Sequence, residues 1–365
     1  MTAASSRVVD VLFVAPPLQC SSPTLYTLNL ATGLRARGCR VKVLTTGGPF
    51  EDVFADRGIP LEIHPLLEKP FVEWFILQGV SRTLRDERWQ VVHAASWRKG
   101  KRAHALGRRL DLPVVVTVHR YASPDQPELD PGALGGVIAL SEDLRANIVN
   151  VRRVPRELVR LIAPGIAELE GPPPEPPFSR PGGAPIVGTI AELDKLDAIE
   201  DFLRAARAVL DRDDRVQFLV VGETERERFR GLVRELGIGK NVISAPSPSG
   251  ALRLLPAFDI SVLPSLREGP GQCLLEALAC GRPVIAIGEG GAFHVVRDEE
   301  TGLLVEKRDP ALIAAAILRL IAAPERARDM GRRAREVALE RFPLERTVDE
   351  TLAFYEQVCA QASAR

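Results

Sequence analysis

Two glutamates and the glycines around them are the residues of this chain best suited to do chemistry. Glu268 lies on a turn that Gly, Pro and Gly at residues 269–271 impose, and Glu276 follows in a short apolar segment. Carboxylates accept hydrogen bonds from hydroxyl groups, often two at a time. Gly290 and Gly291 come one strand later, where backbone N–H groups at the start of a helix can bind phosphate. The set predicts a ligand with sugar hydroxyls at one end and phosphate in the middle.

The segments between these residues have the patterns of a helix and a buried strand. Apolar residues recur at helical spacing over residues 272–280, and Gly281 with Pro283 ends that helix. Residues 284–287 are apolar and largely β-branched, which is typical of a parallel strand covered on both faces. The glycines after this strand lead into a second expected helix, which begins at Ala292.

In this order the motifs resemble the signature of the retaining GT-B glycosyltransferases of family 4. The shared pattern is two glutamates with seven residues between them, Ala-Cys-Gly-x-Pro-Val-Ile-Ala at 279–286, a Gly-Gly turn, and Thr-Gly-Leu-Leu-Val at 301–305. The resemblance covers nearly the whole chain. It implies that Glu268 contacts the donor sugar, that Glu276 binds the ribose hydroxyls of a nucleotide, and that the Gly-Gly turn offers N–H groups to a diphosphate.

The resemblance implies further site residues. His119 follows the buried strand expected at 114–118, and its Thr-Val-His motif matches a family motif whose imidazole faces the donor sugar. We expect His119 to be catalytic with Glu268; a structural histidine is the alternative. For His93 we expect packing or shaping of the acceptor side. The other expected donor-binding residues are Ser265, Gly269, Gly271, Gln272, Cys273 and Leu274.

Strand and helix patterns alternate along both halves of the chain. They predict an α/β protein of two Rossmann-like, doubly wound domains, which the resemblance identifies as a GT-B fold with a cleft between the domains. We expect an N-terminal acceptor domain at 1–167, a Pro-rich linker at 168–183, a C-terminal donor-binding domain at 184–343, and a last helix at 344–365 that crosses back to the first domain. Phe354 and Tyr355 are expected to dock that helix.

The composition limits the partners and the compartment. Lys plus Arg and Asp plus Glu are both 48, so no global basic field exists to hold nucleic acid. The five cysteines lack Cys-x-x-Cys spacing, and we interpret them as reduced, buried thiols. No signal peptide or segment of transmembrane length is visible, which predicts a cytoplasmic protein.

A peripheral contact with the inner face of a membrane is left open by two neighbouring segments. Residues 71–77 are unusually apolar and aromatic, and residues 97–110 carry six Lys or Arg side chains. Such a surface could lie on anionic lipid or receive a lipid-linked acceptor. A solvated face beside an ordinary core helix is the alternative.

Two loops depart from the family pattern. Residues 15–22, after the first expected strand, have none of the glycines usual there, and the second departure concerns charge. Where the family has Gly-Arg-Leu-x-x-x-Lys-Gly, this chain has Glu192 and Asp197 at the two positions that hold the donor diphosphate. A unit charge about 5 Å from a phosphate is worth roughly 3 kcal/mol at an effective dielectric near 20, so two acids could cost several kcal/mol of donor affinity. Lys195 could swing in, Mg²⁺ could bridge the acids to the diphosphate, or the donor could lack a nucleoside diphosphate. If none of these applies, the site has lost its ability to bind the donor diphosphate.

The leading hypothesis is a retaining glycosyltransferase, in polysaccharide biosynthesis for example. It would move a hexose-type sugar from an activated, nucleotide-linked donor to a saccharide, lipid-linked or small-molecule acceptor, with no required cofactor and no bound metal. The alternative is a catalytically impaired GT-B relative that binds a sugar or a protein, because of Glu192 and Asp197. A glycosidase would need an acid and a base or nucleophile across the scissile bond, whereas Glu268 and Glu276 are better placed to grip two ends of one ligand.

Overall fold

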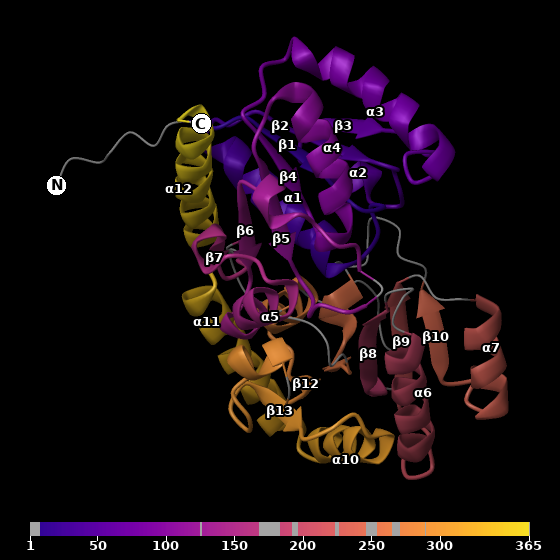
Figure 1. Ribbon diagram of the computed structural model, residues 1–365. Helices are drawn as coiled ribbons and strands as arrows, with labels where there is room; N and C mark the ends of the chain where they lie inside the picture. The colour runs from indigo at the N-terminus through magenta and orange to yellow at the C-terminus, as the bar shows by residue number, and fades with distance from the viewer. Residues whose placement is uncertain are drawn as a thin grey trace. The chain divides into compact units, whose positions relative to one another are not determined.

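Two compact units, each built on a parallel sheet, make up the computed structural model (Figure 1). The structure describes residues 8–124, 126–167, 183–191, 196–222, 226–245, 254–264, 271–288 and 290–364. Of these, the first unit holds the chain up to Leu18, Ser22–Gly165 and the chain from Leu344 onwards; the second holds Gln19–Ser21 and Ile166–Pro343. The predicted linker at 168–183 lies outside the described residues except for Gly183. The predicted fold class, two Rossmann-like α/β units, is confirmed.

The first sheet has seven parallel strands in the order β3-β2-β1-β4-β5-β6-β7. Every residue of the four central strands is buried, as valine-rich strands covered on both faces require. The strands are β1 (Val11–Val14), β2 (Val41–Thr45), β3 (Leu61–Ile63), β4 (Val91–Ala94), β5 (Val114–Val118), β6 (Gly136–Ala139) and β7 (Val159–Leu161).

Helices connect these strands and cover the sheet. The α-helices are α1 (Ser22–Ala36), α2 (Glu51–Asp56), α3 (Pro70–Arg85), α4 (Gly100–Leu110), α5 (Glu142–Arg152) and α12 (Leu344–Ser363), with short 3₁₀ helices η1 (Trp97–Lys99), η2 (Pro131–Ala133) and η3 (Arg156–Leu158). Helix α1 packs against α12, and α3 packs against α4. Ser141 caps α5, because its hydroxyl accepts the Leu144 N–H at 3.2 Å.

The second sheet has six parallel strands in the order β10-β9-β8-β11-β12-β13. Its strands are β8 (Ile186–Ala191), β9 (Gln217–Gly222), β10 (Val242–Ala245), β11 (Ile260–Leu263), β12 (Val284–Ile287) and β13 (Gly302–Val305). Its helices are α6 (Leu196–Leu210), α7 (Arg226–Glu235), η5 (Leu255–Ala257), α9 (Gln272–Ala279), η6 (Gly290–His294), α10 (Pro310–Ile321) and α11 (Pro324–Arg341). Helix α6 packs against α10, and α9 packs against α11.

Both sheets place their strands in the same doubly wound order. In each, the order reverses beside the first strand, between β1 and β4 in the first unit and between β8 and β11 in the second. Open α/β sheets bind ligands outside the carboxyl ends of the strands at this switch point. The fold therefore predicts one ligand-binding edge in each unit.

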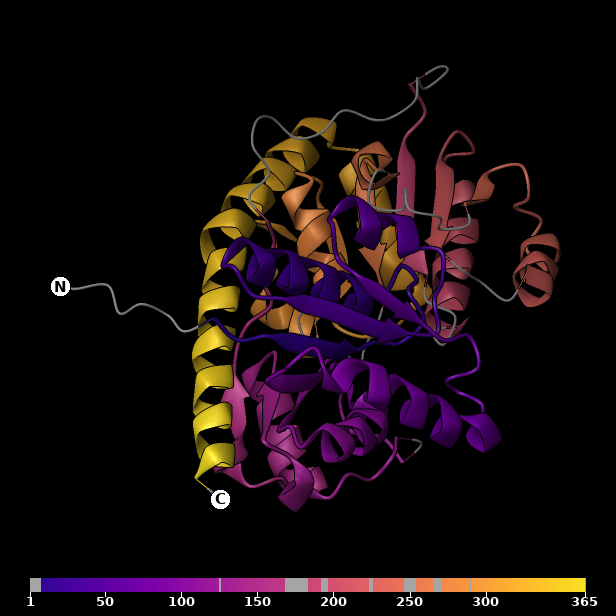
Figure 2. The same ribbon diagram turned by 90° about the horizontal axis from the view of Figure 1, so that it is seen from above.

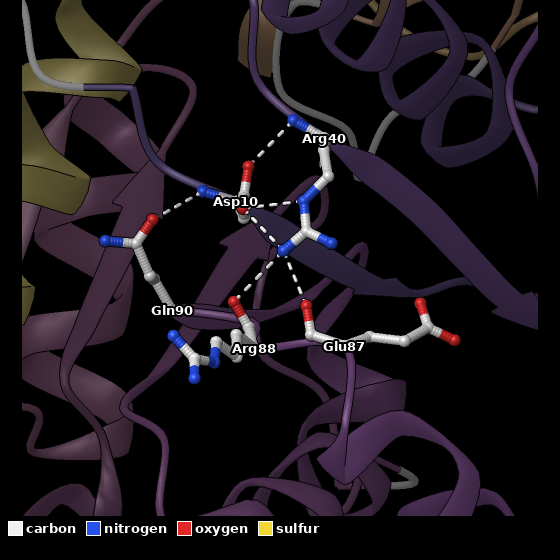
Figure 3. A network of polar contacts seen from close by, with 5 residues as sticks. All are labelled: Asp10, Arg40, Glu87, Arg88 and Gln90. Carbon is white, nitrogen blue, oxygen red and sulfur yellow. Dashed lines mark hydrogen bonds and ion pairs between the residues drawn. The ribbon is translucent and has the colours of Figure 1, made fainter.

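A polar network at the opposite, amino edge ties three strands of the first sheet together (Figure 3). Asp10 precedes β1, and its carboxylate accepts from the Arg40 backbone N–H at 2.9 Å and from Arg40 Nε at 2.8 Å. Arg40 Nη2 donates to the backbone oxygens of Glu87 and Arg88, and Gln90, directly before β4, accepts the Asp10 N–H at 2.9 Å. The network holds the starts of β1, β2 and β4 in register, so their carboxyl ends also align.

The last helix belongs to the first unit, along which it runs in Figure 2 (yellow). Tyr355 is fully buried, and its hydroxyl lies 2.5 Å from Nδ1 of His93 on β4. The Phe354 ring lies over Gly136 so closely that a Cβ at residue 136 would be 2.4 Å from Phe354 Cζ. Both aromatic residues that were expected to dock α12 thus contact the sheet of this unit.

The cysteines and the helices also bear on the sequence predictions. All five cysteines are free thiols; four of them are buried, as predicted, whereas Cys359 is half-buried. None of the described helices is long and apolar enough to cross a membrane.

We predict that Phe354→Ala lowers the free energy of unfolding by about 3 kcal/mol or more, because it removes a buried ring and leaves a cavity over Gly136. Urea unfolding followed by circular dichroism measures this change. The matched control is Phe71→Ala, at a ring that is 92% exposed, which should change stability by less than about 0.5 kcal/mol. Equal unfolding midpoints for the two variants would show that Phe354 does not anchor α12.

Candidate active site

His119 lies at the carboxyl edge of the first sheet, where it joins the ends of three strands. It directly follows β5, and its Nε2 lies 3.0 Å from the backbone oxygen of Ala95, which directly follows β4. The Ala95 N–H in turn donates to the Val14 oxygen at the end of β1, at 3.0 Å. The sequence prediction that His119 follows a buried parallel strand agrees with this position; its role in catalysis stays a prediction.

The surroundings of His119 fix its protonation state. A carbonyl oxygen only accepts, so Nε2 of His119 must carry the proton, and Nδ1 is left as the accepting nitrogen of a neutral ring. Burial lowers the pKa of His119 to about 3, against a smaller opposing effect of the Ala95 hydrogen bond. At neutral pH, therefore, His119 carries no charge and can accept one hydrogen bond from a ligand hydroxyl.

Tyr26 holds the His119 ring from a second side. It comes from α1, and its ring meets the imidazole edge to face, with centroids 5.1 Å apart and an interplanar angle of 81°. Burial raises the pKa of the Tyr26 phenol far above its ordinary value, although the hydroxyls of Thr117 and Thr351 oppose the shift. The neutral phenol therefore adds packing and no charge to this edge of the sheet.

His93 serves packing, one of the two roles that the sequence left open for it. It is fully buried on β4, and its Nε2 lies 2.7 Å from the Thr117 hydroxyl while Nδ1 faces Tyr355. Burial lowers the pKa of His93 to about 3, and His119 adds to the shift. Because both ring nitrogens bond within the protein, His93 has no nitrogen left to contact an acceptor substrate.

The loop after β1 is stabilised by glycines that sequence analysis did not consider. Residues 15–22 contain no glycine, but Gly47 and Gly48, which follow β2 after Thr46, both have positive φ. A Cβ at Gly48 would lie 2.5 Å from the Leu18 oxygen, and Leu18 exchanges backbone hydrogen bonds of 2.9 Å with Gly47 and Phe50. The Gly-Gly pair after a strand was the feature of the sequence from which this close contact could have been predicted. It lets the neighbouring loop approach closely.

A cavity of about 550 Å³ in the first unit lies away from this edge. It is lined by residues at the amino ends of β4, β5 and β6, among them Gln90, Val114 and Gly135. His119 is not among its lining residues. We place the candidate site at the carboxyl edge, because ligands of open α/β sheets bind there.

In the second unit the switch point lies between β8 and β11, which end at Ala191 and Leu263. The predicted residues that follow these two ends in the chain are Glu192, Lys195, Ser265, Glu268 and Gly269, and they lie outside the described residues. Asp197 belongs to the first turn of α6, and its side chain is likewise not described. The roles of these residues stay predictions.

Glu276 is on the described part of this edge, in α9. Gly271 precedes the helix in an extended conformation, and the N–H groups of Leu274 and Leu275 donate to its oxygen at 2.9 and 3.2 Å. Gln272 is 1% exposed, and its Nε2 donates to Glu276 Oε1 at 3.0 Å. The amide thus orients the half-buried carboxylate one turn along the helix.

The remaining predicted residues of α9 contribute packing and the helix start. Cys273 and Leu274 are both 6% exposed, so their side chains belong to the core. The first N–H groups of an α-helix lie outside its hydrogen-bond ladder and give that end a partial positive charge. What α9 can offer a ligand is therefore its backbone start and the Glu276 carboxylate.

Helix α11 holds α9 in place from its other end. Arg335, which is buried, donates from Nη1 to the Ala279 oxygen at 2.6 Å. A Cβ at Gly331 would lie 2.3 Å from the Gly281 oxygen, so only glycine lets α11 approach the turn after α9 this closely. A guanidinium at the C-terminal end of α9 also complements the helix dipole.

The Gly-Gly turn lies at the carboxyl end of β12, where it forms η6. The predicted α-helix from Ala292 is wrong: Gly290–His294 is one 3₁₀ turn, after which the N–H groups of Val295 and Val296 both donate to Ala292. The Thr-Gly-Leu-Leu-Val motif explains the early end. Thr301 Oγ1 accepts the Arg297 N–H at 2.8 Å and closes the next turn.

Gly302 lets β13 lie against β12. A Cβ at this residue would be 2.5 Å from the Val284 oxygen and 2.8 Å from Val296 Cγ1. Gly288 donates its N–H to the Val305 oxygen at 2.8 Å at the other end of the strand pair. The second half of the family signature thus positions the glycine turn.

Among the described residues, no group of three or more His, Cys, Asp or Glu side chains is arranged to hold a metal ion.

Two family models divide the chain between them. Residues 24–168 match the Glycosyltransferase Family 4 model, and residues 175–337 match the model of Glycosyl transferases group 1. A D-inositol 3-phosphate glycosyltransferase of Thermobispora bispora is 30% identical over 77% of this chain and 72% of that protein. One of Acidothermus cellulolyticus is 29% identical over 92% of this chain and 86% of that protein. The chain belongs to the GT-B glycosyltransferases of family 4, and it is a glycosyltransferase.

Solved structures of low identity show the same fold. HepE of Anabaena, in complex with UDP and glucose, is 16% identical with a TM-score of 0.73 over 98% of this chain and 100% of that chain. Sucrose-phosphate synthase of Thermosynechococcus elongatus is 22% identical with a TM-score of 0.72 over 96% of this chain and 100% of that chain.

We predict that the two buried imidazoles destabilise the fold in acid. Each imidazole has a pKa of 6.5 in the unfolded chain and of about 3 in the folded protein. At pH values between these two, the unfolded chain binds more protons than the folded protein does. The free energy of unfolding therefore falls as the pH drops below about 6.5. The fall reaches about 1.4 kcal/mol per pH unit for each histidine. Above about 6.5 both rings are neutral in both states and the effect is absent.

Urea midpoints measured between about pH 7 and about pH 4 test this slope. His93→Gln should reduce the slope of the free energy of unfolding against pH by the contribution of one histidine, whatever the absolute stability of the variant. His104→Gln, on α4, is the matched control and should keep the wild-type slope. An unchanged slope in His93→Gln would mean that His93 is not held neutral.

Proposed function

We propose that this enzyme is a retaining glycosyltransferase that takes its sugar from a nucleoside diphosphate donor. The carrying observation is the position of Glu276 and the Gly-Gly turn. Both belong to motifs that occur in the same order in the family. Helix α9, which carries Glu276, follows β11, and the Gly-Gly turn follows β12, so both lie at the carboxyl edge of the second sheet. This is the edge at which doubly wound sheets bind nucleotides.

The proposed roles follow from the chemistry of each group. Glu276, oriented by Gln272, accepts hydrogen bonds from the ribose hydroxyls. The N–H groups of Gly290 and Gly291 and the start of α9 receive the diphosphate. Glu268 holds the donor sugar. His119, neutral and with Nδ1 as its acceptor, takes a hydrogen bond from a sugar hydroxyl.

The proposed reaction needs no protein nucleophile. The bond from the anomeric carbon to the diphosphate oxygen breaks, and its electron pair leaves with the diphosphate through an oxocarbenium-like state. The acceptor oxygen bonds to the anomeric carbon on the same face, and its proton passes to the departing diphosphate. Retention of configuration follows from this same-face attack.

The relatives indicate which substrates to assay first. HepE was solved with UDP-glucose, and the curated relatives are named for D-inositol 3-phosphate. We therefore put UDP-glucose first among donors and D-inositol 3-phosphate first among acceptors, followed by saccharide and lipid-linked acceptors. Mg²⁺ is not required in this proposal. The comparisons give no support to the alternative of a binding module that has lost catalysis.

A ligand screen followed by product analysis tests the proposal. Thermal shifts with UDP, GDP and their sugars, with and without Mg²⁺, identify the donor, and NMR of the product gives the anomeric configuration. We predict that Glu276→Gln weakens nucleotide binding about tenfold, since a hydrogen bond to a charged group is worth about 1.5 kcal/mol or more. Glu340→Gln, on α11, is the matched control. Unchanged binding in Glu276→Gln, or an inverted product, would contradict the proposal.

The acidic loop gives a separate prediction. If Glu192 and Asp197 occupy the family's diphosphate positions, Glu192→Arg with Asp197→Lys should tighten nucleotide binding, because two repulsions become two attractions. Isothermal titration with UDP at low salt measures the change. Weaker binding in the double variant would mean that this loop does not lie where the motif puts it.

A further inference from the structure

Helix α3 presents an aromatic stripe to solvent. Phe71 is 92% exposed, Trp74 53% and Phe75 66%, whereas Leu77, Val80 and Leu84 on its other side are buried. At 3.6 residues per turn, Arg82 and Arg85 continue the line of the three rings toward the C-terminal end of the helix. We call Phe71, Trp74, Phe75, Arg82 and Arg85 the α3 stripe. Figure 1 shows α3 along the outside of the first unit, beside α4.

The stripe lies in a basic segment of a chain with no net charge. From Lys69 to Leu110 there are ten Lys or Arg residues and three Asp or Glu residues, against 48 of each class in the whole protein. Helix α4 packs against α3, and the side chains of Arg98 in η1 and of Lys101 and Arg108 in α4 are exposed. The local excess of positive charge is therefore built by two adjacent helices.

Two carboxylates beside the aromatic end of the stripe are engaged by cations of α4 and η1. Glu73 Oε1 lies 2.8 Å from Arg102 Nε. Glu68, in the loop before α3, pairs with Lys99 and lies 3.5 Å from Arg102. These ion pairs neutralise the two acids, and exposed basic groups such as Lys69 and Arg82 flank the exposed rings.

An ordinary solvated face accounts for the arginines but not for three exposed rings beside them. Aromatic rings with cations and few free acids are the composition of a helix that lies in the interface of an anionic bilayer. The rings enter the headgroup region, and the cations meet anionic lipid headgroups. We propose that the α3 stripe is a membrane-docking surface whose partner is an anionic lipid bilayer.

Tryptophan fluorescence can test the proposal on the intact protein. The chain has three tryptophans, of which Trp89 is 7% and Trp97 4% exposed, so Trp74 alone is placed to report a change at the surface. Vesicles of phosphatidylcholine mixed with phosphatidylglycerol should shift the emission to shorter wavelengths, and phosphatidylcholine alone should do so far less. About 1 M salt, where the Debye length is about 3 Å, should reverse most of the binding.

Vesicle sedimentation of variants separates the contribution of the aromatic rings from that of the positive charges. Phe71→Ser with Phe75→Ser should lower the affinity for the anionic vesicles about tenfold or more, because binding scales with the apolar area inserted. Arg82→Glu should also lower the affinity for anionic vesicles, and the affinity that remains should depend less on salt than that of the wild type. Trp74→Phe should still sediment with vesicles but lose the spectral shift. Ile243→Ser, which removes a 56% exposed side chain from β10, is the matched control and should bind as the wild type does.

The assays contain no donor or acceptor, so they are independent of the proposed glycosyl transfer. Absence of binding to either vesicle, or equal binding by the wild type and the double serine variant, would overturn the proposal. So would self-association in sedimentation velocity that the double serine variant abolishes, because the stripe would then be covered by a second copy of the chain.

Discussion

Parallel strands all present their carboxyl ends at one edge of a sheet, and this constraint decides where the candidate binding groups of the described chain lie. In the first unit the ends of β1, β4 and β5 are joined by backbone and imidazole hydrogen bonds through Ala95 and His119. In the second, β12 delivers the Gly-Gly turn to the corresponding edge. The amino edges carry structural contacts instead, such as the Arg40 network. Binding and stability are thus separated along the strands of one sheet.

The first unit encloses two imidazoles that must stay neutral. His93 and His119 are both buried, and His93 bonds to the Thr117 hydroxyl and to Tyr355 of the last helix. Tyr26, in contact with His119, comes from α1, which packs against that same helix. The position of the proposed sugar-contacting ring therefore depends on a helix more than two hundred residues away in the chain. A neutral ring suits this role, since a sugar hydroxyl needs an acceptor rather than a charge.

The sequence predicts the regular parts of the fold well, because buried parallel strands are short apolar runs. The strands at 114–118 and 284–287 have the expected bounds. The edge strand β3 was not predicted, since its half-exposed residues carry no apolar run. The α-helix from Ala292 does not form, because η6 ends at His294 and the chain enters a turn in which Thr301 Oγ1 accepts the Arg297 N–H, a side-chain contact that a helix pattern does not reveal. The support of the β1 loop by Gly48, and the tautomer of His119, depend on tertiary contacts that no local pattern encodes. For the candidate site, strand-end positions were predictable; the roles of Glu268, Glu192 and Asp197 rest on the motif alone.

The central claim is that the carboxyl edge of the second sheet binds the nucleotide of the donor. A crystal structure of the protein with UDP tests it most directly. We predict the ribose hydroxyls within hydrogen-bonding distance of the Glu276 carboxylate, and the diphosphate against the backbone N–H groups of Gly290 and Gly291. A nucleotide bound at the amino edge of either sheet, or out of reach of Glu276, would contradict the account.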